Sequence, residues 1–130
     1  MATVAAVIQA RVGSTRLPGK VMYPLEGKPV LERITKRVSR ADCIDDVVVA
    51  TSTEPQDDVI AEYIQTLGTA VVRGSETNVL GRFERVFKQY EPDIVVRLTG
   101  DNPLVSVLFI QECVNRVRTE NVDYVSEGPD

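Results

Sequence analysis

Short apolar runs alternate with amphipathic segments along this chain, and that alternation restricts its possible folds more than any other feature. The apolar runs predict strands at 3–10, 47–51, 70–72, 94–98 and 122–126. Apolar residues at helical spacing predict helices at 30–41, after 56, at 79–90 and at 105–119. Strands that alternate with helices in this way form a mostly parallel sheet with helices on both faces. We therefore expect one α/β domain with three αβα layers.

The carboxyl ends of parallel strands meet at one edge of a sheet, which we call the carboxyl edge, and ligands of such folds bind there. Polar or charged residues follow four of the predicted strands. The first strand runs into the loop 11–20, and the others end at Thr51-Ser52, Arg73 and Asp101. The pattern predicts that these residues lie together at the carboxyl edge.

The loop after the first strand is strongly cationic. Residues 8–20 read Ile-Gln-Ala-Arg-Val-Gly-Ser-Thr-Arg-Leu-Pro-Gly-Lys, and residues 1–25 contain no Asp or Glu although the chain carries a net charge of −4. Glycine lets backbone N–H groups approach phosphate oxygens, and arginine and lysine neutralise their charge. We interpret the loop as a nucleoside triphosphate site, with a solvated cationic turn as the alternative. The candidate binding residues in the loop are Ala10, Arg11, Gly13, Ser14, Arg16 and Lys20.

Two common phosphate-binding motifs do not describe this loop. A Walker A motif has four residues between its glycine and Gly-Lys-[Ser/Thr], whereas five residues separate Gly13 from Gly19 and Val21 follows Lys20. The G-x-G-x-x-G fingerprint of dinucleotide-binding folds is also absent from the sequence. If the loop binds phosphate, it therefore does so without either of these motifs.

The composition excludes several kinds of chemistry. The chain has no histidine, which rules out His-dependent nucleophiles, imidazole bases and His-containing zinc sites. Cys43 and Cys113 lie in apolar surroundings, so we expect buried free thiols in a reducing compartment. No apolar run is long enough to span a membrane, no signal peptide is recognised, and a pI near 4.9 disfavours nucleic acid as a partner. We expect a cytoplasmic protein whose chemistry uses carboxylates, cations, backbone amides or a hard metal ion.

Four further blocks, together with the loop, resemble a known family. They lie at 46–52, 72–76, 79–83 and 95–104. The chain resembles the cytidylyltransferase superfamily of acylneuraminate and 3-deoxy-manno-octulosonate cytidylyltransferases, and most closely its spore-coat polysaccharide biosynthesis protein F group. The resemblance implies a Rossmann-like sheet of the nucleotide-diphospho-sugar transferase type. It also implies that a sugar hydroxyl, typically of an acidic 2-keto sugar, attacks the α-phosphate of CTP and releases pyrophosphate, for surface or spore-coat polysaccharide biosynthesis.

The same resemblance implies a magnesium ligand. Asp101 lies in a Gly-Asp-Asn-Pro turn after an apolar strand. Mg²⁺ typically takes one or two carboxylates and completes its shell with phosphate oxygens and water. Position alone fits a simple turn former equally well. The family's Gly-Asp-x-Pro turn favours Asp101 as the residue that binds the catalytic Mg²⁺.

The resemblance also implies roles for the other edge residues. Cations of the loop would hold the triphosphate and stabilise the leaving pyrophosphate, while Gly13 and Ser14 would contribute amides. Arg73 and Thr99 would face the nucleoside. The implied catalytic residues are Arg11, Arg16, Lys20 and Asp101.

Other charged residues receive structural interpretations. Arg97 falls in an apolar strand, as either a buried ion pair or a substrate-facing cation, and Arg82 is interpreted as a helix-surface charge with a pocket role as the alternative. Asp45-Asp46 and Asp57-Asp58 precede a strand and a helix, where they fit capping and solubility charges. Thr53–Gln56 has the spacing of a capping box for the second helix, and Gly68 is well placed to terminate that helix. Pro29 suits the first turn of the helix before it.

Members of the family are nearly twice as long as this chain, and their second half supplies a further metal-binding carboxylate and much of the acceptor pocket. We therefore interpret residues 1–130 as the truncated nucleotide-binding part of a nucleotidyltransferase domain, which binds CTP–Mg²⁺ weakly and turns over poorly alone. The alternatives are a sugar-phosphate nucleotidyltransferase that uses another NTP and a catalytically incomplete nucleotide-binding module. Arg11 stands where those other loops carry glycine and favours CTP. The expected partners are CTP and a sugar acceptor, and a bare edge at the last strand would allow a homodimer.

Overall fold

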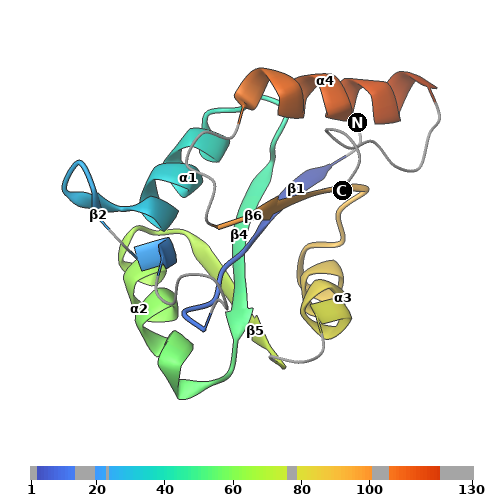
Figure 1. Ribbon diagram of the computed structural model, residues 1–130. Helices are drawn as coiled ribbons and strands as arrows, with labels where there is room; N and C mark the ends of the chain where they lie inside the picture. Colours follow the sequence, from blue (N-terminus) through green and yellow to red (C-terminus); the bar gives the residue numbers. More distant parts are fainter. Residues whose placement is uncertain (1–2, 14–19, 23, 76–78, 101–105, 121–130) are drawn as a thin grey trace.

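The computed structural model describes residues 3–13, 20–22, 24–75, 79–100 and 106–120. Parallel strands in this part of the chain form a sheet in the order β5-β4-β1-β6 (Figure 1). Their bounds are β1 Val4–Gln9, β4 Asp46–Ser52, β5 Ala70–Gly74 and β6 Ile94–Thr99. The predicted parallel sheet is confirmed, and the strand predicted at 122–126 lies outside the described residues.

Helices cover both faces of the sheet (Figure 1). The cores show that α1 (Val30–Ser39), α2 (Asp58–Thr66) and α4 (Val107–Glu120) pack on one face and α3 (Val79–Tyr90) on the other. The predicted three-layer αβα architecture is therefore confirmed. Within the described ranges, none of the helices has both the length and the apolar character that crossing a membrane requires.

The central strand β1 is buried on both sides, which explains its near-continuous apolar sequence. Val4, Ala6 and Ile8 face the core shared with α1, α2 and α4, whereas Val7 faces α3. All four side chains are fully buried. Truncating a buried residue such as Ile8 to Ala typically costs about 2–5 kcal/mol of stability. Strand β1 is thus the fixed axis from which the carboxyl edge is built.

A short hairpin precedes α1. Strands β2 (Pro24–Leu25) and β3 (Lys28–Pro29) pair antiparallel, after a 3₁₀ turn, η1, at Lys20–Met22. The two turn residues, Glu26 and Gly27, have φ values of 54° and 85°. Positive φ at both positions is typical of a type I′ turn, which matches the twist of the paired strands. The proline expected in the first turn of α1 lies just before that helix instead, in β3.

The start of α2 differs from the sequence-based expectation. The capping box predicted at Thr53–Gln56 is wrong, because a 3₁₀ turn, η2 (Pro55–Asp57), precedes the helix and the N-cap Asp57 makes no side-chain capping hydrogen bond. Proline favours the first position of such a turn, and the Asp57 carboxylate has other partners. The end of α2 agrees with the prediction, since Gly68 adopts a φ of 79° and terminates the helix.

A polar cluster joins α1 to α2. Glu32 is only 3% exposed, accepts a hydrogen bond from the Tyr63 hydroxyl, and lies 3.0 Å from Lys36 Nζ and 3.5 Å from Lys28 Nζ. The hydrogen bond from Tyr63 is the main cause of a lowered pKa for Glu32; burial opposes it, and the two lysines reinforce it. The cluster holds together the two helices that flank the first loop.

Two of the apolar side chains whose helical spacing predicted the helices lie nearer the surface. Val59 in α2 and Phe87 in α3 are 47% and 48% exposed, because Ile60 and Val86 take the sheet-facing positions beside them. Cys43 and Cys113 are half-buried and form no disulfide among the described residues. Burial raises the pKa of the Cys43 thiol, so it is mostly protonated at neutral pH.

Candidate functional site

The carboxyl ends of the strands are held side by side. In register, Gln9 lies opposite Ala50 of β4 and Thr99 of β6, and Ser52 lies opposite Gly74 of β5. Beyond the strands, Ala10 N–H donates to the Ala50 carbonyl at 3.0 Å, which continues the ladder by one residue. The structure therefore brings Ala10, Ser52, Arg73 and Thr99, all predicted to share this edge, to the same end of the sheet.

Gly100 brings the turn after β6 against the end of β1. Its N–H donates to the Gln9 carbonyl at 2.7 Å. A Cβ at this position would lie 2.9 Å from that carbonyl oxygen and 3.0 Å from Ala10 Cβ. Only glycine allows so close an approach of two backbone segments. The turn that leads to Asp101 therefore starts beside the residue that leads to Arg11.

The first residues of the cationic loop turn back onto η2. Val12 N–H donates to Asp57 Oδ1 at 2.7 Å, and a Cβ on Gly13 would lie 2.8 Å from Gln56 Nε2. Arg11 is half-buried. Ser14 and Arg16 lie outside the described residues, as does the side chain of Lys20, whose backbone belongs to η1. The start of the loop is thus fixed by contacts with a segment some 45 residues further along the chain.

Asp57 is the buried centre of this edge. It is 0% exposed, and its second carboxylate oxygen accepts a hydrogen bond from the Ser52 hydroxyl, which is itself fully buried. Ser52 Oγ in turn accepts the Glu54 N–H at 3.1 Å. The interpretation of Asp57 as a solubility charge is wrong, because η2 folds its carboxylate inward between two buried donors. Its neighbour Asp58 is exposed, as predicted.

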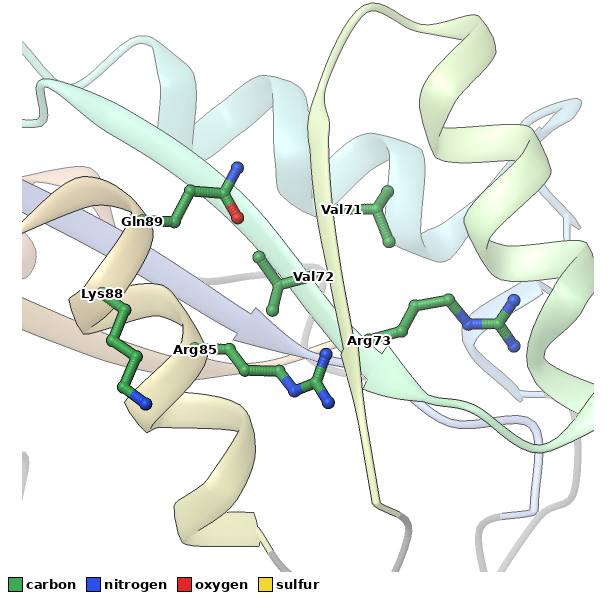
Figure 2. A pocket seen from close by; sticks show the side chains of 6 residues that line it. All are labelled: Val71, Val72, Arg73, Arg85, Lys88 and Gln89. Atoms are coloured by element: carbon green, nitrogen blue, oxygen red, sulfur yellow. The ribbon is translucent and has the colours of Figure 1, made fainter.

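Arg73 is held by the connection between β4 and α2. Its Nε donates to the Ser52 carbonyl at 2.8 Å and its Nη2 to the Glu54 carbonyl at 3.0 Å, and Nη2 lies 2.8 Å from Asp58 Oδ1. Figure 2 shows the Arg73 side chain on the opposite side of β5 from the side chains of α3. Arg73 therefore braces the carboxyl edge, and its contact with a nucleoside stays a prediction.

Arg82 is not the surface charge that helical spacing suggested. It is 2% exposed and packs against the end of β5, where a Cβ on Gly74 would lie only 2.7 Å from Arg82 Cγ. The absent side chain at Gly74 makes room for the stem of a long cationic residue. A buried guanidinium beneath the carboxyl edge keeps open the alternative of a pocket role for Arg82.

Arg97 is exposed, so the first of its two interpretations, a buried ion pair, is wrong, and the second, a substrate-facing cation, stays a prediction. Strand β6 is an edge strand among the described strands, and Arg97 pairs in register with Val7, which faces α3. Its guanidinium carbon lies 5.5 Å from the centroid of the Phe83 ring of α3. That distance is typical of a cation–π contact, which accounts for an arginine in an otherwise apolar strand.

Two buried polar groups lie at the edge, where the sequence placed Thr51 but did not single out Gln9. Gln9 Nε2 and Thr51 Oγ1 are inaccessible to solvent, and neither has a hydrogen-bond partner within the described part of the chain. Buried groups of this kind are usually satisfied by water or a ligand. Both sit near the ends of apolar strands, where composition alone gives no reason to separate them from the core.

A separate cavity of about 360 Å³ lies between β5 and α3. Figure 2 shows its lining, in which Val71, Val72 and Arg73 come from the strand and Arg85, Lys88 and Gln89 from the helix. Apart from Arg73, no residue predicted for the nucleotide site lines this cavity. It therefore flanks the candidate site rather than forming it.

The described residues do not form a metal site. They contain no group of three or more His, Cys, Asp or Glu side chains suited to hold a cation. At the carboxyl edge, the Asp57 carboxylate binds Val12 N–H and Ser52, and Asp58 pairs with Arg73. Asp101, the predicted Mg²⁺ ligand, lies outside the described residues. Magnesium binding by Asp101 therefore stays a prediction.

Comparisons with known proteins match this arrangement. The family model for cytidylyltransferases matches residues 5–129. The spore coat polysaccharide biosynthesis protein SpsF of Bacillus subtilis is 38% identical over 122 residues, covering 91% of this chain and 51% of SpsF. A cytidylyltransferase from Leptospira borgpetersenii superposes with a TM-score of 0.83 at 37% identity, over 88% of this chain and 48% of that one. A CMP:2-keto-3-deoxy-manno-octonic acid synthetase solved with CTP gives a TM-score of 0.80 at 26% identity, over 92% and 48%.

These matches extend along nearly the whole chain but not along the whole of the relatives. The chain spans about half the length of the curated relatives it matches. The order of its strands and the resemblance of its sequence blocks agree with the matched family. The family predicted from the cationic loop and the four further blocks is confirmed, and the chain belongs to the cytidylyltransferase family.

Proposed function

We propose that this chain forms the nucleotide-binding part of an enzyme that transfers CMP from CTP to a sugar and releases pyrophosphate. The single observation that carries the proposal is the contact of Gly100 N–H with the Gln9 carbonyl at 2.7 Å. This contact joins the two family blocks, because the Arg11 loop and the turn before Asp101 start from adjoining backbone. The CTP complex of a relative that superposes on this chain supports CTP as the nucleotide.

In the proposed reaction, the sugar hydroxyl oxygen forms a new bond to the α-phosphorus of CTP. The bond from that phosphorus to the bridging oxygen breaks, pyrophosphate leaves with the bonding electrons, and the hydroxyl proton passes to solvent. Charge therefore accumulates on the leaving group. Arg11, with Arg16 and Lys20, neutralises that charge, while Arg73 and Thr99 contact the nucleoside. Preorganised cations of this kind stabilise a transition state more than they stabilise the ground state.

The proposal includes a bound Mg²⁺ ion, with Asp101 as its ligand. When bound, the ion would neutralise phosphate oxygens of the nucleotide. Because the carboxylates described at the carboxyl edge are already hydrogen-bonded or paired, Asp101 is the residue to test. We expect EDTA, or Asp101→Asn, to weaken CTP binding measured in the presence of Mg²⁺, and Mg²⁺-independent binding would contradict the assignment.

The acceptor is proposed from the relatives. By name, one relative is a CMP:2-keto-3-deoxy-manno-octonic acid synthetase and another is a spore coat polysaccharide biosynthesis protein. We infer that the acceptor is a sugar, and that an acidic 2-keto sugar is the first to assay. The reaction would take place in the cytoplasm, where CTP is available. Association into a homodimer would be checked by sedimentation velocity.

Isothermal titration calorimetry tests the nucleotide assignment. The purified protein is titrated with CTP, UTP, GTP and ATP, each with Mg²⁺, and CTP should bind at least ten times more tightly than the others. Arg11→Ala should weaken CTP binding more than tenfold, whereas Arg37→Ala, which removes an exposed cation on α1, should leave it unchanged. Tighter binding of UTP or GTP than of CTP would refute the cytidylyl assignment.

Turnover separates an enzyme from a binding module. Pyrophosphate release is measured with CTP, Mg²⁺ and 3-deoxy-manno-octulosonate or an acylneuraminate. CTP binding with no release for any acidic 2-keto sugar, even in a protein that includes the second half found in relatives, would favour a nucleotide-binding module. Release with a sugar phosphate and another NTP would favour a different nucleotidyltransferase.

A further inference from the structure

Asp57 connects three segments that converge at the carboxyl edge. Its Oδ1 accepts Val12 N–H from the cationic loop at 2.7 Å, and its Oδ2 accepts the hydroxyl of Ser52 at the end of β4. It lies at the end of η2, directly before α2. One side chain therefore joins the loop after β1 to β4 and to the start of a helix.

Burial of the Asp57 carboxylate carries a cost in desolvation free energy. Asp57 and Ser52 are both 0% exposed. A carboxylate removed from water loses several kcal/mol of solvation that hydrogen bonds must offset, and an apolar side chain would often pack there at lower free energy. The two hydrogen bonds satisfy the carboxylate and leave Val12 in one orientation. Such a polar network fixes a geometry more than it adds net stability.

A second arm of the network reaches β5. Arg73 Nε donates to the Ser52 carbonyl at 2.8 Å, and Arg73 Nη2 donates to the Glu54 carbonyl at 3.0 Å. Glu54 N–H returns to Ser52 Oγ at 3.1 Å. The hydroxyl that binds Asp57 is thereby fixed from the other side as well. The loop, β4 and β5 consequently share one hydrogen-bonded frame.

We propose that Asp57 is a positioning residue that holds the Arg11–Gly13 turn in its phosphate-binding orientation. The proposal rests on the proposed function. The peptide between Arg11 and Val12 is planar and trans, so an N–H aimed at Asp57 forces the Arg11 carbonyl in the opposite direction. The Val12 N–H is committed to Asp57 and does not bind phosphate. The phosphates are left to the Arg11 side chain and to the amides that follow Val12.

The proposal distinguishes geometry from charge. In Asp57→Asn, the amide oxygen still accepts the Val12 N–H, and the amide nitrogen donates to Ser52 Oγ in place of receiving its proton. The turn keeps its orientation, while the negative charge and the acceptor of the Ser52 hydroxyl proton are lost. In Asp57→Ala both bonds are lost. We therefore expect Asn to rescue nucleotide binding that Ala abolishes.

Calorimetry with CTP and Mg²⁺ tests the binding consequence, because it measures stoichiometry and Kd separately. Asp57→Ala should raise Kd at least tenfold at unchanged stoichiometry, Asp57→Asn should stay within about threefold of the parent protein, and Ser52→Ala should fall between them. A merely structural role would lower the stoichiometry, through misfolded protein, and leave the Kd of the folded fraction unchanged. That result, or an Asn variant as weak as Ala, would overturn the proposal.

Asp45 provides the matched control. It accepts Val4 N–H at 2.7 Å, so Asp45→Ala removes a bond of the same kind at the opposite end of β1. Its Kd for CTP should equal that of the parent protein. If Asp57→Ala does not fold, Ser52→Ala takes its place in the test. Its Kd for CTP must then be higher than that of Asp45→Ala, and an equal Kd would refute the proposal.

Amide exchange of Val12, measured by ¹⁵N NMR without nucleotide, separates this proposal from the proposed function. The amide should be protected in the parent protein and in Asp57→Asn, and should exchange at least tenfold faster in Asp57→Ala or, if that variant is unfolded, in Ser52→Ala. Unchanged exchange would refute the role of Asp57. A protein that shows this protection pattern but binds no nucleotide would refute the proposed function while leaving Asp57 as the residue that orients the turn.

Discussion

The two ends of β1 are tied by the same kind of bond but in different surroundings. At the amino end Val4 N–H donates to Asp45 Oδ2, and beyond the carboxyl end Val12 N–H donates to Asp57 Oδ1, both at 2.7 Å. Asp45 is exposed, whereas Asp57 is fully buried. The Asp45 carboxylate is open to water, whereas the Asp57 carboxylate is closed off from it, so removing Asp57 also leaves the fully buried Ser52 hydroxyl without its acceptor. The two bonds are equal in length, but we expect removal of the acceptor to cost more stability at the carboxyl edge, which carries the candidate site.

The largest expected effect on stability is that of Asp57→Ala. The substitution removes the acceptor of the Val12 N–H, which is half-buried, and of the Ser52 hydroxyl, which is fully buried. Each such group costs about 1–3 kcal/mol, so the free energy of unfolding should fall by about 2–6 kcal/mol. Urea denaturation of Asp57→Ala beside Asp45→Ala measures the difference. Equal losses in the two variants would contradict the comparison between the two ends of β1.

Gly100→Ala should come next. The new methyl group would lie 2.9 Å from the Gln9 carbonyl oxygen, which is backbone and cannot move aside, so we expect a loss of about 1–3 kcal/mol. Gly13→Ala is the matched control, because its methyl group meets only the end of the Gln56 side chain, which is exposed and can rotate away. Thermal denaturation should show a clear loss for the first variant and little for the second. The reverse order would mean that Gln9 and Gly100 are not in the close contact described.

How far the sequence could predict this molecule depends on the range of the contacts involved. Strand β1, helix α1 and the stop at Gly68 follow from local periodicity and from the conformational freedom of glycine, and each was predicted correctly. Asp57 and Asp58 look identical in sequence, yet η2 turns one inward and leaves the other exposed. That difference is created by a hydrogen bond to Val12, 45 residues away.

Arginines show the same limit. The position of Arg82 relative to the apolar residues of α3 fits a helix surface. The missing side chain at Gly74 nevertheless lets Arg82 pack beneath β5. Arg97 falls in an apolar strand, and its exposure follows from the position of β6 at an edge of the described sheet. In both cases the environment is set by a neighbouring strand or helix rather than by adjacent residues. The cationic loop was recognisable because its signal is entirely local.

Arg73→Ala tests the outer part of the buried frame and should have a moderate effect. It removes hydrogen bonds to the Ser52 and Glu54 carbonyls and the ion pair with Asp58. The guanidinium is partly exposed and water replaces some of these contacts, so we expect a loss of about 1–2 kcal/mol. Arg73→Lys keeps the charge but cannot reach both carbonyls, and should recover less than half of the loss in urea denaturation. Full recovery by lysine would show that charge, rather than the two carbonyl contacts, is what matters.

The smallest effects are expected at the amino end of β1, where the comparison can be broken most directly. Asp45→Ala removes the acceptor of Val4 N–H, and Asp93→Ala removes the acceptor of Thr3 N–H, which lies 2.8 Å from Asp93 Oδ2. Both carboxylates are exposed, so water takes their place and each variant should lose only about 0.5–1 kcal/mol in urea denaturation. The double variant should depart from the sum of the two losses, because the two donors belong to the adjacent residues Thr3 and Val4. A loss as large as that of Asp57→Ala would mean that burial of the carboxylate does not determine how much these bonds contribute to the free energy of unfolding. The carboxyl edge would then be held no more firmly than the amino end of β1.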